Sequence, residues 1–285
     1  VMVSTWVQPI NLTINSRFGS YLYDGAGVSA MEYSTNLYLV IAGVFVLSIT
    51  NVIFPKLSRL TAQHQETAFQ DTLRQTVHGC LFFVLPMAAG LMLLARPLVS
   101  FLYGGGEFDE FSVSITSQAL VWVSLGMVGY ALQNILSRSY FAKKNGRTPL
   151  VAGGLSILAN IGLCMVLTEP LGVAGLAISS TVSSTLYAIL LLVPLERRGE
   201  GVLSKAFVAD FGKMLLSAAV MSGAVWLLRG ALEGALPGGK MGELLLLGIC
   251  AAAGAVVYFL LSALLRLEEM NLVRSILAKR LRKRG

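Results

Sequence analysis

Apolar residues along the chain gather into long runs that are separated by short polar or glycine-rich connectors. Seven runs are long enough, at about 20 residues, to cross the hydrocarbon core of a bilayer as a helix. They cover residues 37–54, 79–102, 111–137, 149–168, 171–195, 207–228 and 241–265. Residues 1–18 form an eighth run, which we interpret as the end of a truncated helix. The pattern predicts an all-α integral membrane protein, a multi-helix bundle with short connectors.

The composition agrees with membrane helices. Hydrophobic residues make up 55% of the 285 residues and charged residues only 13%, about half of the roughly 25% usual in soluble domains. The mean hydropathy is +0.72. Cys80, Cys164 and Cys250 each lie within an apolar run and lack the spacing of a disulfide framework or a zinc site. We therefore expect no metal and no other cofactor.

Lysine and arginine are distributed unevenly between alternate connectors. Eighteen of the 22 lie on one set of connectors and in the C-terminal tail, and four lie on the other set. Because Lys and Arg favour the cytoplasmic side, this bias predicts a multi-pass membrane protein with a cytoplasmic C-terminus. The net charge of +7 does not predict a nucleic acid partner, since the basic residues form no face interleaved with aromatic residues.

The tail, residues 266–285, has an amphipathic pattern. Its apolar residues at helical spacing are Leu267, Met270, Val273, Leu277 and Leu281. Lys and Arg fill most other positions, which predicts a helix that lies on the anionic lipids of the inner leaflet. A frayed, solvated tail is the alternative interpretation.

Residues 62–78 have a similar pattern on a smaller scale. Phe69, Leu73 and Val77 share one helical face and predict a second interfacial helix, in which His64 and His78 are solvated. Two histidines in one connector, without an intramembrane carboxylate pair, provide neither an acid/base pair nor a metal site. We predict that the protein is not an enzyme.

Polar residues form a stripe in the first run. Ser4, Gln8, Asn11 and Asn15 fall on one helical face, and Pro9 removes a backbone hydrogen bond and should bend the helix. A bent helix with a polar face suits a transport cavity. Hydrogen bonding between helices of the bundle is an equally good interpretation.

Small residues and prolines mark the other runs. Three glycine pairs predict close helix packing and two prolines predict kinks: Gly126/Gly129, Gly172/Gly175, Gly248/Gly254, Pro86 and Pro194.

Four stretches in order carry more specific motifs. Residues 28–60 carry two tyrosines near their start and close on IFPKLSR, and residues 86–109 end in the turn LYGGGEFD. Residues 138–148 read RSYFAKKNGRT and precede Pro149, and residues 170–181 read PLGVAGLAISST. Together these stretches resemble the MurJ/MviN family, within the MATE-like exporter superfamily, over nearly the whole chain up to about residue 200.

The resemblance implies a fold, a domain division and an activity. It implies a fourteen-helix flippase that carries the lipid-linked peptidoglycan precursor lipid II, on undecaprenyl pyrophosphate, from the inner to the outer leaflet by alternating access. Residues 1–200 would be the second lobe of the MATE-like fold, residues 201–265 an extra helix pair with an apolar groove for the lipid tail, and residues 266–285 the cytoplasmic tail. The partner lobe, N-terminal in the family, would be missing from this chain.

The chain departs from the family at several polar positions. Asn36 and Leu39 stand where many members have an arginine and a carboxylate, and Asn15 and Cys164 stand where members often have carboxylates. Without a charged oxygen, a cation would bind weakly there. The residues that we expect to line the cavity and contact the headgroup are Gln8, Asn11, Asn15, Arg17, Asn36 and Asn160.

Two other interpretations stay open at this point. One is an exporter of another lipid-linked polysaccharide or of a small molecule in the same superfamily. The other is an inactive, truncated membrane scaffold, because alternating access needs two lobes.

Overall fold

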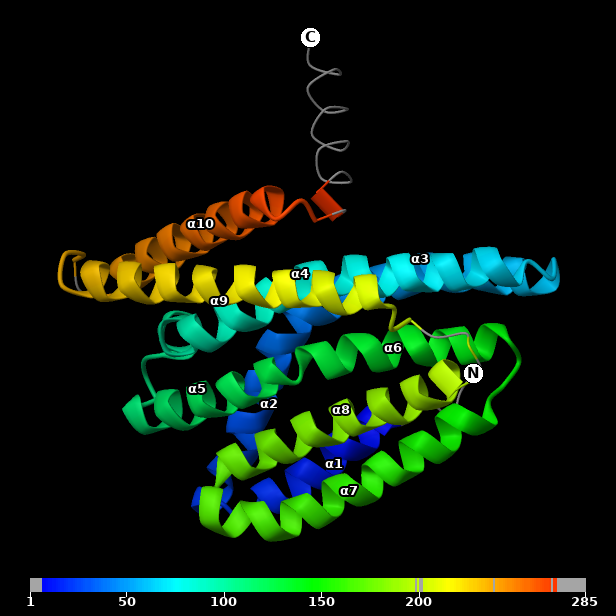
Figure 1. Cartoon of the computed structure of the whole chain (residues 1–285). Coiled ribbons are helices and arrows are strands. Elements are labelled where there is room, and N and C mark those ends of the chain that lie inside the picture. The colour runs from blue at the N-terminus through cyan, green and yellow to red at the C-terminus, as the bar shows by residue number, and fades with distance from the viewer. Residues whose placement is uncertain (1–6, 198, 200–201, 238, 268, 271–285) are drawn as a thin grey trace.

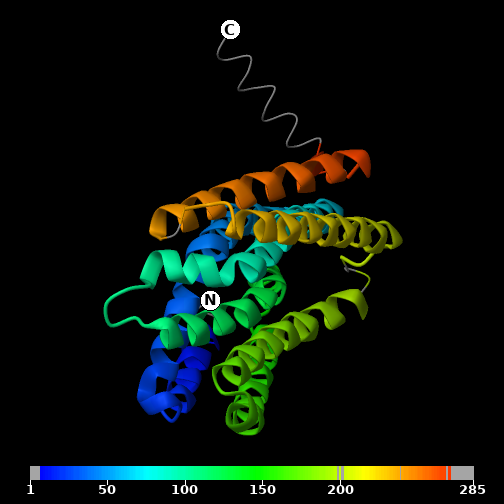
Figure 2. The ribbon, with the colours of Figure 1, turned by 90° about the vertical axis from the view of Figure 1, so that its left-hand side faces the viewer.

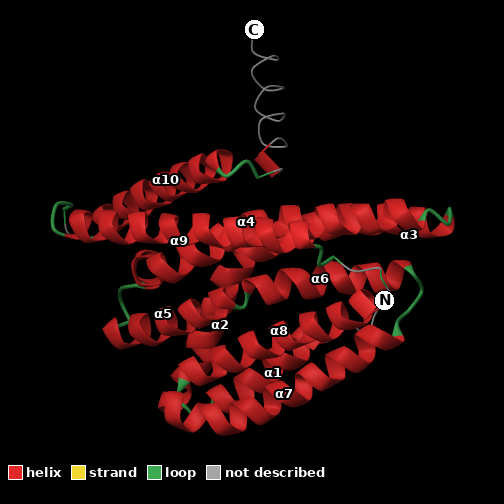
Figure 3. Cartoon of the chain, in the orientation of Figure 1, coloured by secondary structure: helices red, strands yellow, loops and turns green. Residues whose placement is uncertain are grey.

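The structure is a computed structural model that describes residues 7–197, 199, 202–237, 239–267 and 269–270 (Figure 1). All regular elements of these residues are helices (Figure 3). Six of them are long and apolar enough to cross a membrane, or seven if a bent pair counts as one span. The predicted all-α membrane fold is therefore confirmed.

The first helices form a nearly continuous stretch after α1 (Val7–Gly19). A short η2 (Tyr23–Gly25) leads into α2 (Ala26–Tyr38), a π-helical turn η3 (Leu39–Gly43) and α3 (Val44–Ala62). The span predicted at residues 37–54 is thus too short. The helical stretch already includes polar residues before position 37, which the hydrophobic pattern left out. One of these, Ser34, is fully buried and donates to the Met31 carbonyl at 3.0 Å, so its polarity is satisfied within the helix.

Helix α4 (Glu66–Tyr103) has 38 residues and a length of about 57 Å. The predicted separate helix at 62–78 is wrong, since most of that segment is the first part of α4. Its apolar face is buried in the protein rather than set against lipid, and Phe69, Leu73 and Val77 are each 1% exposed. His64 is exposed in the turn before α4, as predicted.

The prediction that His78 is solvated is wrong. Its Nδ1 lies 3.3 Å from a carboxylate oxygen of Glu269, and its ring makes an edge contact with Phe207 at 4.5 Å between centroids. These contacts connect α4 to the beginning of α9 and to the residues that follow α10.

The span predicted at 111–137 is two helices, α5 (Glu110–Leu125) and α6 (Met127–Ala142), which meet at an angle of 45°. At the break the Gly126 amide turns to the Val123 carbonyl, which leaves the Trp122 carbonyl without its usual donor. The Thr181 hydroxyl of α8 donates to this carbonyl at 2.7 Å. The bend therefore depends on a neighbouring helix and not on a proline.

Helices α7 (Arg147–Leu171) and α8 (Val173–Arg197) form an antiparallel pair beside α1 (Figures 1 and 2). Gly172 turns the chain with a φ of 58°, a conformation that favours glycine. A Cβ at Gly175 would lie 2.1 Å from the Leu167 carbonyl oxygen. The close packing predicted for this glycine pair is confirmed.

Helices α9 (Lys205–Glu233) and α10 (Lys240–Leu264) lie with α4 on the opposite side of the molecule from α1 and α7 (Figures 1 and 2). Gly254 brings α10 against Val225 of α9, but a Cβ at Gly248 would have open space around it. Only one glycine of the predicted third pair therefore serves close packing. Most of the predicted tail helix, residues 271–285, lies outside the described residues.

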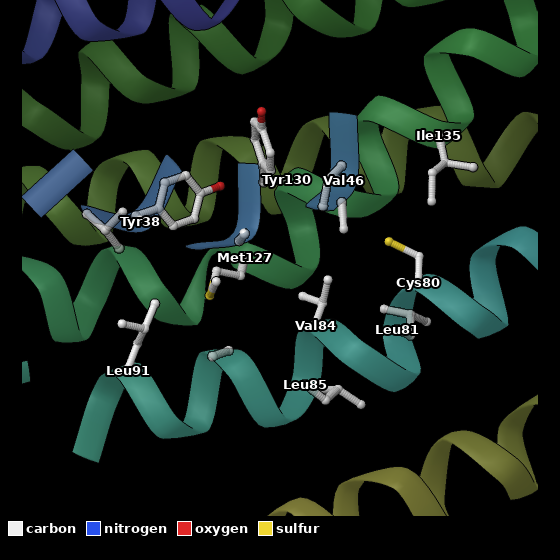
Figure 4. Close-up of a cluster of buried hydrophobic side chains, with 14 of the residues drawn as sticks. Tyr38, Val46, Cys80, Leu81, Val84, Leu85, Leu91, Met127, Tyr130 and Ile135 are labelled. Carbon is white, nitrogen blue, oxygen red and sulfur yellow. The ribbon is translucent and has the colours of Figure 1, made fainter. Parts of the chain in front are cut away.

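The core lies where α4 crosses η3, α3 and α6 (Figure 4). Val84 of α4, Val46 of α3 and Met127 of α6 are fully buried there, and Tyr38 packs edge-on against Tyr130. This contact joins α2 to α6.

Candidate functional site

A cluster of polar side chains joins α1, α7 and α8 in the interior. Asn15 donates from Nδ2 to the Ser180 hydroxyl at 2.5 Å, and its Oδ1 accepts from Asn160 Nδ2 at 3.3 Å and from Cys164 Sγ at 3.5 Å. Asn15 is 3% exposed, and Asn160 and Cys164 are fully buried. We call Asn15, Asn160, Cys164 and Ser180 the amide cluster.

The amide cluster is suited to hold helices together. Its members form hydrogen bonds with one another, and it contains no carboxylate. In the part of the chain that the structure describes, no group of three or more His, Cys, Asp and Glu could hold a metal ion. Amide, thiol and hydroxyl groups without a charged oxygen make a weak cation site. At Asn15 and Asn160 the geometry favours hydrogen bonding between helices.

Gln8 and Asn11 line a small cavity of about 70 Å³ between α1, α2, α6 and α8. Asn11 donates to the Ser183 hydroxyl at 3.4 Å, while its buried Oδ1 has no partner among the described residues. The other polar residues of the wall include Thr35, Tyr38, Gln133, Thr181 and Ser184. Such a space suits ordered water and is too small for a sugar headgroup.

A larger polar pocket of about 340 Å³ adjoins this cavity and shares Gln8, Tyr130 and Gln133 with it. We call it the α6 pocket, because Asn134, Ser137 and Arg138 of α6 also line it. Arg138 is the one charged residue among those that line the two spaces. This pocket was not predicted, because Arg138 follows a hydrophobic run and such a position indicates only a connector charge. The signal was the spacing of residues 133, 134, 137 and 138 on one helical face.

The other two predicted residues lie apart from these cavities. Arg17 is exposed near the end of α1, with its guanidinium 5.2 Å from the centre of the Tyr21 ring. Asn36 is exposed on α2. Of the six predicted residues, Gln8, Asn11 and Asn15 line the small cavity, Asn15 and Asn160 belong to the amide cluster, and Arg17 and Asn36 are exposed. Their contact with a substrate stays a prediction.

An apolar groove of about 400 Å³ lies between α4, α9 and α10. Its walls include Met87, Leu91 and Leu94 of α4, Val225 of α9 and Phe259 of α10.

Two hydrogen bonds join the helices that form this groove. The Tyr258 phenol donates to the Phe82 carbonyl, and Arg229 Nη1 donates to the Leu93 carbonyl, both at 2.7 Å. The groove is therefore a feature of the packed helices and not a loose gap.

A bundle of apolar helices long enough to span a membrane, with polar cavities on one side and a separate apolar groove on the other, is the architecture of a multi-pass membrane protein. The comparisons with known proteins agree. The family model described as "Lipid II flippase MurJ" matches residues 1–261, and the chain belongs to this family. The resemblance found in the sequence is thereby confirmed.

Relatives and a solved structure give the extent of the match. The chain is 30% identical over 265 residues to the probable lipid II flippase MurJ of Thermotoga maritima, covering 93% of this chain and 51% of that protein. It is 30% identical over 219 residues to the probable lipid II flippase MurJ of Vibrio cholerae, covering 77% and 42%. A structure titled "Lipid II flippase MurJ, inward closed conformation" superimposes with a TM-score of 0.76 at 26% identity, covering 92% and 52%. The chain spans about half the length of the relatives it matches.

Proposed function

We propose that the intact protein is a flippase that moves a lipid-linked peptidoglycan precursor from the inner to the outer leaflet of a bacterial inner membrane. Residues 1–200 would form one lobe, residues 201–265 an additional helix pair, and residues 266–285 a tail on the anionic cytoplasmic surface. A second lobe of the same protein would complete the path, because alternating access needs two bodies that rock against each other.

The observation that carries this proposal is the pairing of two different cavities in one chain. An undecaprenyl-linked sugar is a long apolar chain with a polar, anionic headgroup. The groove between α4, α9 and α10 offers an almost wholly apolar surface, while the α6 pocket and the small cavity beside it offer amide, hydroxyl and guanidinium groups. A drug-like solute that is uniformly apolar would have no use for the second kind of site.

The polar residues would have different parts in transport. Gln8, which also lines the α6 pocket, would face the headgroup there, and Asn11 would hold water in the small cavity beside it. Asn15 and Asn160 would keep α1 attached to α7 and α8 as the lobe moves. Arg17 and Asn36, which are exposed on this lobe, would face the partner lobe or the headgroup. The cycle would be a conformational exchange and not a covalent reaction.

Complementation tests the proposal. The intact protein would be expressed in cells depleted of their own lipid II flippase, beside a Gln8→Leu/Asn11→Leu variant that removes the polar wall of the small cavity. A Thr13→Val/Ser16→Ala variant is the matched control, since these exposed hydroxyls bond only to carbonyls of their own helix.

Rescue by the intact protein and by the control, with loss of rescue in the cavity variant at equal membrane abundance, is the expected result. A well-expressed intact protein that gives no rescue contradicts the proposal and favours another lipid-linked polysaccharide or a small molecule as substrate.

A further inference from the structure

We propose that the break between α5 and α6 is a hinge with a bent and a straighter position, and that the Thr181 hydroxyl of α8 holds it in the bent one. The hinge itself rests on contacts within the described residues. Its part in transport rests on the proposed function, in which Thr181 would be a positioning residue that acts through the helix and not on the substrate.

The hydrogen bonds at the break have direct replacements in a straight helix. In the structure the Gly126 amide donates to the Val123 carbonyl at 3.0 Å, and the Thr181 hydroxyl donates to the Trp122 carbonyl at 2.7 Å. In a continuous α-helix the Gly126 amide would itself donate to the Trp122 carbonyl, four residues back. The Thr181 hydroxyl would then turn to a carbonyl of its own helix, as the Thr185 hydroxyl already does at 2.8 Å. The Trp122 carbonyl is therefore paired in both positions, which keeps their free energies close.

The bend is not fixed by a proline. Residues 110–142 contain none, whereas a proline kinks a helix permanently because it removes an amide hydrogen and its ring displaces the preceding turn. Helices α5 and α6 are long and apolar enough to cross a membrane only as a pair, bent by 45°. A single span that is interrupted at a glycine and held by a neighbouring side chain is free to straighten when that side chain lets go.

Two glycines bring α8 against the break. A Cβ at Gly126 would lie 2.8 Å from Thr181 Oγ1, and a Cβ at Gly129 would lie 2.9 Å from backbone atoms of Thr185. Side chains that interlock between two helices fix their crossing angle, and a face of glycines lacks them. The contact with α8 therefore supplies both the donor that holds the bend and a smooth surface on which α6 turns.

A second helix break lies beside the first. The π-helical turn η3 begins at Leu39, directly after Tyr38, and the Tyr38 ring packs edge-on against Tyr130 in the first turn of α6, with 5.4 Å between centroids. Turns of this kind carry an extra residue and often occur at functional sites. Movement of Tyr130 would press on Tyr38 and reach η3, so the two breaks would change together. Leu39 and Tyr130 both line the α6 pocket, whose shape would follow the hinge.

The test measures the bend in the intact protein in lipid nanodiscs, by double electron–electron resonance between nitroxide labels. The exposed pair Ser114→Cys/Leu171→Cys reports on α5, and the exposed pair Lys144→Cys/Arg197→Cys reports on α6, each relative to the α7 and α8 pair. The cysteines of the described chain are buried, and protein without added cysteines gives the background. Thr181→Val keeps the shape and removes the hydroxyl. It should raise the population of a second distance in one pair roughly threefold to tenfold, the shift that loss of one hydrogen bond produces.

Thr185→Val is the matched control, because Thr185 lies one turn further along α8, contacts Gly129 and uses its hydroxyl within its own helix. Thr181→Ser should restore the wild-type distances, since it keeps the hydroxyl. Gly126→Ala is a second test variant and should shift the populations in the same direction as Thr181→Val. Its Cβ would collide with Thr181 in the bent position, and alanine favours a continuous helix.

Identical distance distributions in the wild type and Thr181→Val overturn the proposal. An equal shift in Thr185→Val, or no recovery in Thr181→Ser, also overturns it, since packing against α8 and not the hydroxyl would then set the bend. If Thr181→Val does not accumulate as folded protein, the same comparison between Gly126→Ala and the wild type decides.

The result is separable from the outcome of complementation. If the distances shift as expected while the intact protein fails to rescue flippase-depleted cells, the hinge stands and the proposed function fails. If the wild type rescues and the distances are the same in Thr181→Val, the hinge fails alone. Where both hold, Thr181→Val should slow the growth of the rescued cells, and Thr185→Val should not.

Discussion

The Tyr258 phenol of α10 hydrogen-bonds the backbone carbonyl of Phe82 in α4 at 2.7 Å. Pro86, four residues after Phe82, has no amide hydrogen, so this carbonyl lacks a donor within its own helix. The same relationship recurs eleven residues further along α4: Pro97 leaves the Leu93 carbonyl without a donor, and Arg229 of α9 supplies one at 2.7 Å. Each proline of α4 thus creates an attachment point for the C-terminal helix pair.

Replacing Tyr258 by Phe should destabilise the packing of α10 on α4. The variant leaves a buried carbonyl unsatisfied while keeping the ring, so we expect the free energy of unfolding to fall by about 1 kcal/mol. Unfolding of the intact protein in mixed micelles, followed by tryptophan fluorescence, measures the change.

A double-mutant cycle with Pro86→Ala makes the prediction specific. Alanine restores an amide hydrogen that can satisfy the Phe82 carbonyl, so the cost of Tyr258→Phe should be close to zero in that background. An equal cost in both backgrounds would show that the phenol acts in some other way.

Arg229→Met should have the larger effect of the two attachment points. Its bond to the Leu93 carbonyl is charge-assisted, and its loss should lower the free energy of unfolding by roughly 1–3 kcal/mol. Arg229 also pairs with Glu233 at 2.6 Å on an exposed side of α9. Glu233→Gln is therefore the control, and a drop in stability as large as that of Arg229→Met would assign the effect to the ion pair instead.

The sequence predicted the helices well and their continuity poorly. The hydrophobic runs locate the apolar spans because burial in lipid requires a long apolar segment. They could not show that residues 66–78 continue into α4, since an amphipathic face that packs on protein has the same pattern as one that lies on lipid. Nor could they show the break at Gly126, because a hydroxyl from α8, 55 residues away, stabilises it.

The candidate site was predicted only in part, because its contacts also depend on how neighbouring helices pack. The helical spacing placed Gln8, Asn11 and Asn15 on one face, and all three line the small cavity. Only the packing of α7 and α8 shows that Asn15 is also 3% exposed and hydrogen-bonded to Ser180 and Asn160. Arg138 was not predicted as a pocket residue. The sequence does not show its neighbours in space, and an arginine near the end of an apolar run is then assigned to the membrane boundary.

Gly129→Ala should separate α6 from α8. A Cβ at Gly129 would lie 2.9 Å from backbone atoms of Thr185, so one helix must move, at a cost of roughly 1–3 kcal/mol. Gly162→Ala in α7 is the control, because a Cβ there has nothing within 4 Å and alanine favours a helix by up to about 1 kcal/mol. Equal thermal midpoints for the two variants would contradict the close contact.

Asn15→Leu should destabilise the lobe more than the same change at Asn36. Asn15→Leu removes the amide nitrogen that donates to Ser180 and the amide oxygen that accepts from Asn160. It leaves buried polar groups unpaired, so the free energy of unfolding should fall by about 1–3 kcal/mol. Asn36 is exposed on α2, so Asn36→Leu should leave the unfolding midpoint nearly unchanged. A comparable loss in both variants would mean that the amide cluster does not hold α1 in place.

Asn15→Asp should convert the amide cluster into a site that responds to sodium. The new carboxylate would be buried beside Asn160, Cys164 and Ser180, and an uncompensated buried charge is destabilising. A carboxylate, an amide oxygen and a hydroxyl are the oxygen ligands that hard cations accept, so sodium should restore part of the lost stability by binding the folded state. The measurement compares unfolding midpoints in sodium chloride and in choline chloride at equal ionic strength. The wild type, whose cluster is neutral, should show no difference, and a sodium effect of the same size in the wild type would contradict a structural role for these amides.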